Sequence, residues 1–568
     1  MKQLDIQLLT QNSLRLSQIT SHYWVEGRPD EKGRCALVKR DLSEPLSKEA
    51  NVKSRVYAYG GAAYLATDEH LFYIDESTKT LSMDGSPLTK PEDGSFADLC
   101  FDAHRKCLYA VREIKDLATI ARIDLNGAVT DLLSGADFYA APRLSPDGKH
   151  LAYISWNHPN MPWDQVTLHL FDFSTDTIIG ENAAYQHPLW HPDGTLYYLS
   201  DQTGYWNLYT QKGPICPING DLGYPPWVLG LQRFCFIDNA IAAILTEDAT
   251  DSLILIQNGS YQTLNLPFTS YTDIATDGSK ILAIAASPTS VRSIISIDPK
   301  TASYTTLRKS KDVHLNTIST PVSINCGVPL HFYPPSNPLY ERPPLILRCH
   351  GGPTAHSAPI LNLEIQYWTS RGFAYAEVNY RGSSGFGKHY RDALGGNWGI
   401  YDVEDATTAA QYLIDNDLVN PNQCAIMGSS AGGFTALCAA TFKDTFSAAI
   451  SLYGISDLEA LTKNTHKFEA HYNDHLIGPY PECKQRYIDR SPIHHLDKIT
   501  CPILLLQGDC DQIVLPEQSE KLYEALKPRA EYHLFKGEGH GFRQAATIKA
   551  SFEIQESFLK RVFQGTNH

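Results

Sequence analysis

The run Gly428-Ser429-Ser430-Ala431-Gly432-Gly433 constrains the fold of this chain more than any other segment. It matches G-x-S-x-G, a pattern in which a strand turns sharply into a helix and exposes the central serine hydroxyl. The apolar run before it predicts a buried strand, and the Ala-rich run after it predicts a packed helix. Glycine suits both ends of this turn, because a Cβ would obstruct the close approach of two backbone segments. Ser430 is therefore the candidate nucleophile.

Two later segments supply candidate partners for this serine, whose hydroxyl needs a base to accept its proton. In α/β-hydrolases the acid and the base follow the serine in the order Ser, Asp or Glu, His. Here an apolar run leads into Asp509 and Asp511, and a glycine-rich loop carries His540. We assign His540 as the general base and Asp511 as the acid that orients it, with Asp509 as the competing acid. The shared order favours this triad over an incidental serine in a glycine-rich loop.

The segment His350-Gly351-Gly352-Pro353 follows a predicted strand and resembles the glycine loops of esterases. A tetrahedral intermediate needs preorganised N–H donors for its oxyanion. We expect one donor from the backbone of Ala431, directly after the nucleophile. The second should come from Gly352, with Gly351 as the other candidate.

Residues 1–315 repeat a unit in which an Asp-containing turn precedes an alternating apolar strand. The copies are 143–153, 189–198, 275–283 and, more weakly, 101–109. Their spacing is about 45 residues or a multiple of that, which is the length of a four-stranded propeller blade. The pattern predicts an N-terminal β-propeller, for which we expect seven blades. The alternative is a β-sandwich with common Pro-Asp-Gly turns.

Residues 316–568 alternate apolar strand-like runs with helical stretches. This alternation predicts an α/β-hydrolase catalytic domain with a mostly parallel, doubly wound sheet and helices on both faces. Strands are expected at 344–349, 374–379, 424–427, 448–452, 503–507 and 532–535, and helices after Ser430 and at 403–414, 517–526 and 548–563.

Composition excludes several classes of function. The chain has 568 residues and a net charge of −15, which suits a multidomain globular protein and argues against binding to nucleic acid. No apolar run approaches the roughly 20 residues of a membrane helix, and the N-terminus does not resemble a secretory signal. The 12 cysteines lack C-x-x-C spacing, so we expect free thiols in the cytoplasm, without a metal or an organic cofactor. Homo-oligomerisation stays open.

A longer motif adds to the pattern of the three loops described above. It runs from Asn379-Tyr-Arg-Gly-Ser-Ser-Gly-Phe-Gly to Asp405. With these motifs the chain resembles the prolyl oligopeptidase family, in its acylaminoacyl-peptidase and bacterial dipeptidyl-peptidase branch. The resemblance implies a seven-bladed propeller that caps an α/β-hydrolase domain, with the active site buried between them. It also implies hydrolysis of short peptides, exclusion of folded proteins, and the triad Ser430, Asp511 and His540.

The sequence departs from that family at two points. Many relatives carry Arg or Asn two positions after the catalytic Asp, where this chain has Ile513, whose side chain donates no hydrogen bond. There is also no match to the paired glutamates with which dipeptidyl-peptidase relatives bind a free amino terminus. As candidates for substrate contact we assign Tyr453, Ile455, Ile513 and Trp156.

The sequence therefore predicts a serine peptidase that cleaves short peptides through an acyl-enzyme. Its mode would be that of an acylaminoacyl-peptidase, an oligopeptidase or a dipeptidyl-peptidase. The alternative enzyme is a carboxylesterase that acts on small esters, since a triad alone does not separate amides from esters. A non-enzymatic alternative is a propeller interaction module fused to an inactive hydrolase.

Overall fold

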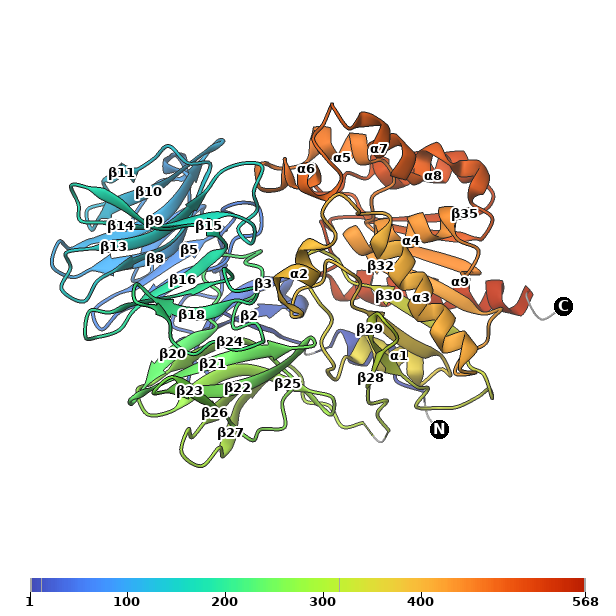
Figure 1. The fold of residues 1–568 in the computed structure, drawn as a ribbon, viewed down its shortest axis with the longest axis horizontal. Coiled ribbons are helices and arrows are strands. Elements are labelled where there is room, and N and C mark those ends of the chain that lie inside the picture. Colours follow the sequence, from blue (N-terminus) through green and yellow to red (C-terminus); the bar gives the residue numbers. More distant parts are fainter. Residues whose placement is uncertain (1–2, 12, 316, 566–568) are drawn as a thin grey trace.

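The computed structural model describes residues 3–11, 13–315 and 317–565. Figure 1 shows two units side by side, a ring of antiparallel sheets and a mixed sheet covered by helices. Residue 316, at which the sequence predicts that the second unit begins, lies outside the described residues.

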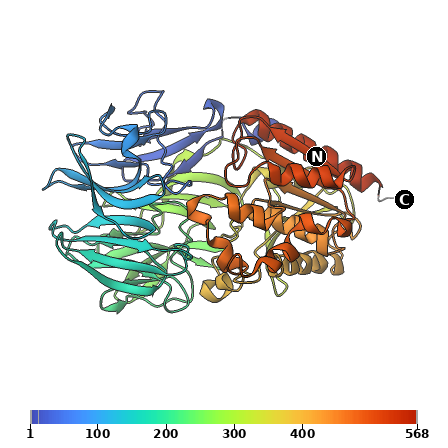
Figure 2. The same cartoon turned by 90° about the horizontal axis from the view of Figure 1, so that it is seen from above.

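The N-terminal unit is a β-propeller. Within the described residues, seven antiparallel sheets follow one another along the chain, the first with three strands and the others with four, and Figures 1 and 2 show them as blades of one ring. The predicted seven-bladed propeller is confirmed. The first four blades contain β1 (Arg15–Ser17), β2 (Tyr23–Arg28) and β3 (Arg34–Lys39); β4 (Tyr64–Ala66), β5 (Leu71–Asp75), β6 (Thr80–Met83) and β7 (Ser86–Pro87); β8 (Ser95–Asp102), β9 (Cys107–Ile114), β10 (Leu117–Asp124) and β11 (Val129–Leu133); and β12 (Phe138–Leu144), β13 (Leu151–Trp156), β14 (Val166–Phe171) and β15 (Asp176–Ala183). The other three contain β16 (Tyr185–Trp190), β17 (Leu196–Ser200), β18 (Asn207–Thr210) and β19 (Gly213–Pro214); β20 (Phe234–Ile237), β21 (Ala240–Glu247), β22 (Thr250–Gln257) and β23 (Ser260–Thr263); and β24 (Ser270–Thr276), β25 (Ile281–Ser287), β26 (Ser290–Ile297) and β27 (Tyr304–Lys309).

The repeated turns occupy one structural position. Each of the four predicted units is the hairpin between the first and second strands of a blade. The aspartate of the turn accepts backbone hydrogen bonds, from Lys149 N to Asp147 Oδ1 at 3.1 Å and from Lys280 N to Asp277 Oδ1 at 2.8 Å. A short carboxylate that caps its own turn explains why the unit is visible in the sequence.

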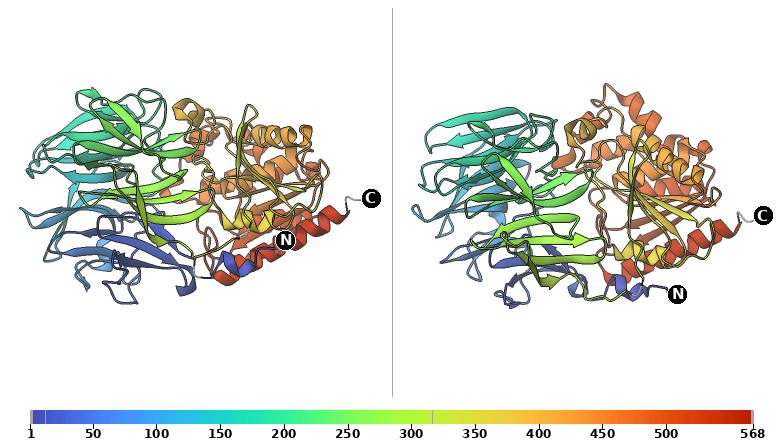
Figure 3. Two further views of the ribbon diagram at one scale, coloured as in Figure 1. Left: turned by 90° about the horizontal axis from the view of Figure 1, so that it is seen from below. Right: turned by 60° about the horizontal axis from the view of Figure 1, so that its bottom comes forward.

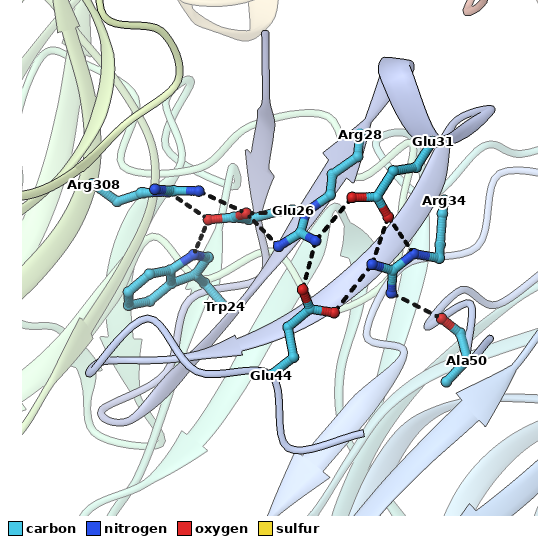
Figure 4. Close-up of polar contacts among 8 residues, drawn as sticks. All are labelled: Trp24, Glu26, Arg28, Glu31, Arg34, Glu44, Ala50 and Arg308. Atoms are coloured by element: carbon cyan, nitrogen blue, oxygen red, sulfur yellow. Dashed lines mark hydrogen bonds and ion pairs between the residues drawn. The ribbon is translucent and has the colours of Figure 1, made fainter. Parts of the chain in front are cut away.

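The ring closes through side chains of the first and last blades. Trp24 on β2 packs with Leu282 on β25, in a cluster that both blades share. Glu26 is buried and accepts hydrogen bonds from Trp24 Nε1 at 3.1 Å, Arg308 Nε at 2.7 Å and Arg28 Nη2 at 3.0 Å (Figure 4). Burial alone would raise the pKa of Glu26, but the hydrogen bonds from Arg308 and Trp24 outweigh burial and lower it. The buried carboxylate is therefore charged and joins the two blades.

The C-terminal unit is built on an eight-stranded sheet with the order β28-β29-β31-β30-β32-β33-β34-β35. From β31 to β35 neighbouring strands are parallel, and β28 and β29 form an antiparallel edge. The predicted α/β-hydrolase architecture is confirmed. The strands are β28 (Val322–Asn325), β29 (Pro329–Tyr333), β30 (Leu345–Cys349), β31 (Ala374–Val378), β32 (Cys424–Ser429), β33 (Ala448–Leu452), β34 (Ile503–Gly508) and β35 (Ala530–Phe535).

Helices cover both faces of this sheet, as alternate strand residues require. On β30, Leu347 packs into a core with α3, α4 and α8, whereas Ile346 packs into a core with α1 and α9. The N-terminal 3₁₀ helix (Ile6–Leu9) joins the second core, and Figure 3 shows it beside α9. The helices are α1 (Leu363–Thr369), α2 (Gly387–Asp392), α3 (Tyr401–Asp415), α4 (Ala431–Phe442), α5 (Leu458–Asn464), α6 (Tyr472–Leu476), α7 (Lys484–Arg490), α8 (Glu517–Leu526) and α9 (Ala545–Gly565). Among the described residues, none of these helices has the length and apolar character needed to cross a bilayer.

Helix α2, which lies within the long 379–405 motif, docks the hydrolase unit on the fifth blade. Arg391 Nη2 and Lys388 Nζ lie 2.6 Å and 2.9 Å from the buried carboxylate of Asp201. The backbone N–H of Gly387 donates to Asp221 Oδ2 at 3.0 Å. Because these carboxylates are buried, the ion pairs fix the position of the propeller over the edge of the sheet that carries the candidate triad.

Candidate active site

Ser430 lies on a strained turn between β32 and α4. Its φ of 54° and ψ of −122° are unusual for a residue with a side chain, and such strain is typical of a nucleophile that a turn exposes. A Cβ on Gly428 would lie 2.1 Å from the carbonyl oxygen of Gly432, and one on Gly432 would lie 2.2 Å from that of Cys349. Only glycine lets the backbone segments come this close, which explains why the motif has glycine at both positions.

The structure brings Ser430, His540 and Asp511 together. His540 Nε2 lies 2.8 Å from Ser430 Oγ, and His540 Nδ1 lies 2.8 Å from Asp511 Oδ2. Asp511 is 2% exposed, and its other oxygen accepts the backbone N–H groups of Ile513 at 2.9 Å and Val514 at 3.0 Å. Gln507 Nε2 also donates to Oδ2 at 3.1 Å, so three donors besides the histidine hold the carboxylate, which in turn orients the ring that faces the serine.

The competing acid, Asp509, does not contact the histidine. Its Oδ1 accepts the backbone N–H of Gly537 at 2.6 Å, at the base of the loop that carries His540. Asp509 therefore shapes the loop, and the geometry leaves Asp511 as the carboxylate beside the imidazole.

Both expected oxyanion donors line the same pocket as Ser430. Ala431 is the first residue of α4, where an N–H has no acceptor within its own helix. Gly352 has a φ of +120°, at which a side chain would be strained. The neighbouring His350 is structural: its Nε2 lies 2.7 Å from Ser383 Oγ, its ring stacks on Tyr380, and burial lowers its pKa to about 4.

The pocket beside Ser430 is apolar and tight. Its walls include Ile455 and Ile513, two of the residues assigned from the sequence as candidates for substrate contact, together with Trp398, Tyr472 and Val514. Its volume of about 30 Å³ is close to that of one water molecule, so a larger substrate side chain enters only when these walls move.

The other two predicted contact residues lie elsewhere. Tyr453 packs its ring against His540 at 4.9 Å between centroids and lines a neighbouring cavity. Trp156 ends β13 in the propeller core, 4% exposed and stacked on Phe138, and it is not among the residues that line the pocket.

A carboxylate that the sequence analysis did not single out faces this pocket. Glu469 lines it, accepts a hydrogen bond from Tyr59 of the propeller at 2.8 Å and lies 3.5 Å from His466 Nε2. Burial and the nearby Glu469 carboxylate raise the pKa of Tyr59, so the phenol keeps the proton that it donates. The rings of Trp227 and Phe468 pack on Tyr59 at 5.6 Å and 6.0 Å. One acidic group thus stands among aromatic rings at the mouth of the tight pocket.

Comparison with known proteins agrees with this architecture. A sequence profile of the prolyl oligopeptidase family matches residues 359–566. The chain is 32% identical over 231 residues to dipeptidyl aminopeptidase BIII of Pseudoxanthomonas mexicana, a match over 39% of this chain and 34% of that protein. It is 31% identical over 206 residues to the mouse acylamino-acid-releasing enzyme, over 34% of this chain and 28% of that protein. These matches span about a third or less of the curated relatives' own length.

A solved structure extends the likeness to the whole chain. A puromycin-hydrolyzing peptidase of Mycobacterium tuberculosis superposes with a TM-score of 0.93 and 31% identity, over 98% of this chain and 96% of the other. A puromycin hydrolase superposes with a TM-score of 0.93 and 29% identity, over 99% and 97%. The family expected from the motifs is confirmed: this chain belongs to the prolyl oligopeptidase family.

Proposed function

We propose that this protein is a serine peptidase that hydrolyses short peptides through an acyl-enzyme. The observation that carries the proposal is the continuous hydrogen-bonded series Asp511–His540–Ser430 beside a small pocket that Ile455 and Tyr472 line. Family membership supports it, because the named relatives are peptidases.

The geometry suits each step of acyl transfer. Ser430 Oγ attacks the scissile carbonyl while His540 Nε2 takes its proton, and Asp511 stabilises the resulting imidazolium. The N–H groups of Ala431 and Gly352 receive the developing oxyanion. His540 then gives the proton to the leaving amine, and water repeats the sequence on the ester.

The tight pocket and the docked propeller favour short peptides over folded proteins, because a folded chain cannot reach Ser430 past both units. The twelve free thiols support the further proposal of a cytoplasmic location. We test the function with a fluorophosphonate probe, which should add its mass to Ser430. Chromogenic alanine amides should exceed short-chain esters in kcat/KM relative to their uncatalysed rates, whereas the reverse ratio would favour the carboxylesterase alternative.

A second observation favours one substrate class within this function. Glu469 and the surrounding rings suit an ammonium group, since a carboxylate and aromatic faces both attract cations. We therefore propose that peptides with a free amino terminus are cleaved in preference to acylated ones. Mass spectrometry of products from a library with free and acetylated amino termini tests this; equal cleavage of both sets would contradict it.

A further inference from the structure

A larger cavity, of about 630 Å³, lies between the propeller and the loop that carries His540. Its walls come from the first and last blades, from the connecting segments 52–61 and 228–231 of the propeller, and from Arg543, three residues after the histidine. An adjoining cavity of about 280 Å³ shares Arg15 and Arg543 with it and extends to Ser429 and Gly541, next to the candidate nucleophile and base. The two cavities therefore share two cationic side chains next to the loop that carries His540.

Four cations line this cavity without ionic partners. They are Arg15, Lys53, Arg292 and Arg543, and we call them the basic cluster. Among the residues that the structure describes, none of the four has a carboxylate oxygen within 4.0 Å. The polar contacts that their side chains make are to neutral oxygens, such as that from Arg292 Nη1 to Thr272 Oγ1 at 3.1 Å.

Another cation in the same wall shows the contrast. Arg28 also lines the cavity, but its guanidinium lies within 3.1 Å of the carboxylates of Glu26, Glu31 and Glu44 (Figure 4). Paired arginines are thus available in this fold. The four side chains of the basic cluster differ from Arg28 because they lack carboxylate partners in the described structure, although the chain has a net charge of −15.

Three members of the cluster, Arg15, Lys53 and Arg543, lie close enough to repel one another, whereas the main charge that acts on Arg292 is the carboxylate of Asp251. Burial lowers the pKa of Arg543, and the neighbouring Arg15 lowers it further. Burial also lowers the pKa of Lys53, with added repulsion from Arg55 and Arg543. Like charges held together in a cavity are relieved when an anion binds between them.

The position of the cluster identifies which part of a substrate it meets. His540 must protonate the leaving amine, so the released fragment lies against the loop of His540. Arg543 belongs to that loop, and Arg15 Nη2 donates to the carbonyl oxygen of Phe542 at 3.3 Å. Under the function proposed above, the acyl part occupies the tight pocket of Ile455 and Tyr472, which Ser430 also lines.

We propose that the basic cluster is a carboxylate subsite for the leaving fragment, which selects short peptides whose carboxylate reaches the cavity. The inference rests on the peptidase function proposed above. Guanidinium and ammonium groups form charge-assisted hydrogen bonds with carboxylates, and a short peptide brings one at its C-terminus. An acidic side chain near that end offers the same chemistry.

Three peptides test the subsite and distinguish the two sources of carboxylate. They are Ala-Ala-Ala as the free acid, Ala-Ala-Ala as the carboxamide, and Ala-Ala-Asp as the carboxamide; alanine suits the tight pocket. We expect kcat/KM for the free acid to exceed that for the plain carboxamide by about 10- to 100-fold, the factor that charge-assisted hydrogen bonds supply. A gain with either carboxylate supports the subsite, and the arm that shows the gain identifies the source. Equal values for all three peptides would overturn the proposal.

Variants tie the preference to the cluster. The double variant Lys53→Gln, Arg292→Gln should bring the ratio of acid to carboxamide close to one, and Lys53→Gln alone should lower it in part. Lys300→Gln is the matched control, because it removes one positive charge from an exposed propeller position, at 80% side-chain exposure. The ratio compares two substrates on one preparation, so loss of folded protein cancels. A full preference in the double variant would refute the assignment.

A binding measurement separates this inference from the proposed function. Calorimetry with Ser430→Ala and the uncleaved peptides measures the same preference without turnover. If the wild-type protein cleaves no peptide, the proposed function fails. If Ser430→Ala then still binds the free acid more tightly than the carboxamide, the subsite stands. Equal dissociation constants would refute the subsite, whatever the enzyme cleaves.

Discussion

The two cavities that we assign to the two ends of a peptide differ in size, polarity and origin. The pocket of Ile455, Ile513 and Tyr472 has a volume of about 30 Å³ and belongs mainly to the hydrolase unit. The cavity of the basic cluster has a volume of about 630 Å³ and belongs mainly to the propeller. The first contains the carboxylate of Glu469 among aromatic rings. The second contains four cations that form no ion pair within the described part of the chain, together with the carboxyl group of Asp273.

This difference gives the site a direction. A short peptide carries an ammonium group at one end and a carboxylate at the other, and the two cavities offer the opposite charge to each. Under the two proposals, a peptide bound the right way gains at both ends, whereas a reversed peptide meets repulsion at both. The hydrolase unit would supply the chemistry, and the propeller would supply the polarity that aligns the substrate.

The strongest test removes the candidate nucleophile. We expect Ser430→Ala to lower kcat by roughly 10⁴- to 10⁶-fold, the scale of triad loss. Both cavities stay intact, so the dissociation constant of Ala-Ala-Ala should change little. Steady-state kinetics and calorimetry on one preparation measure both quantities. Turnover like that of the wild type would remove Ser430 from the mechanism.

The next test concerns the cations that do have partners. Glu26→Gln leaves Arg308 and Arg28 without their buried carboxylate, and breaking such a pair costs about 3–5 kcal/mol. Thermal unfolding followed by tryptophan fluorescence should show a propeller that melts earlier. Glu531→Gln is the control, because its ion pair with Arg561 is exposed and contributes about 0–1 kcal/mol. Equal shifts in the two variants would contradict a role for Glu26 in closing the ring.

The acyl side is tested through Glu469. Glu469→Gln should lower the preference for free over acetylated amino termini by about 10- to 100-fold, because a neutral amide loses the charge-assisted contact with the ammonium group. Glu459→Gln is the control; this acid contacts Tyr480 and Lys484 and is not among the residues that line the pocket. A preference that survives in Glu469→Gln would assign ammonium recognition to another group.

Much of the architecture follows from local patterns. The blades could be predicted because an aspartate caps the turn of each repeated unit. The apolar runs before Ser430 and Asp511 predicted strands of the sheet. The triad residues could be grouped from sequence, because parallel strands bring their carboxyl ends to one edge. A feature that depends only on residues close together in the chain can be predicted from the sequence.

The two charged features could not be found in this way. Tyr59 and Glu469 form a hydrogen bond across 410 positions, and no local pattern links them. The basic cluster draws Arg15 from the first blade, Lys53 from the connection to the second and Arg292 from the last, and in the sequence each resembles an ordinary surface cation. Trp156 shows the opposite case: it stands beside a proline-rich loop, but the strand extends through it and turns its ring into the core.

The smallest predicted effect uses the acid in the wall of the basic cavity. Asp273 lines it, and burial raises the pKa of this carboxyl to about 7. Below that pH the group is neutral, and above it a negative charge enters the cavity. The ratio of kcat/KM for free acid to carboxamide should therefore fall by about two- to fivefold as pH rises from about 6 to 8. Effects of pH on the shared chemical step act on both peptides alike and cancel in the ratio.

Two variants test whether Asp273 causes this change of the ratio with pH. Asp273→Asn keeps an oxygen for the N–H of Gln232, which Asp273 Oδ1 accepts at 3.0 Å, but it does not ionise, so the ratio should become flat with pH. Its stability should respond as well. The pKa of Asp273 in the folded protein is raised above the usual 3.8, so its contribution to stability is complete below pH 3.8 and is lost as the pH rises toward about 7. The stability of Asp273→Asn should not show this pH dependence. Glu469→Gln, which changes the other cavity, should keep the slope of the ratio. A slope that disappears in Glu469→Gln and persists in Asp273→Asn would mean that the two cavities do not act separately on the two ends of the peptide.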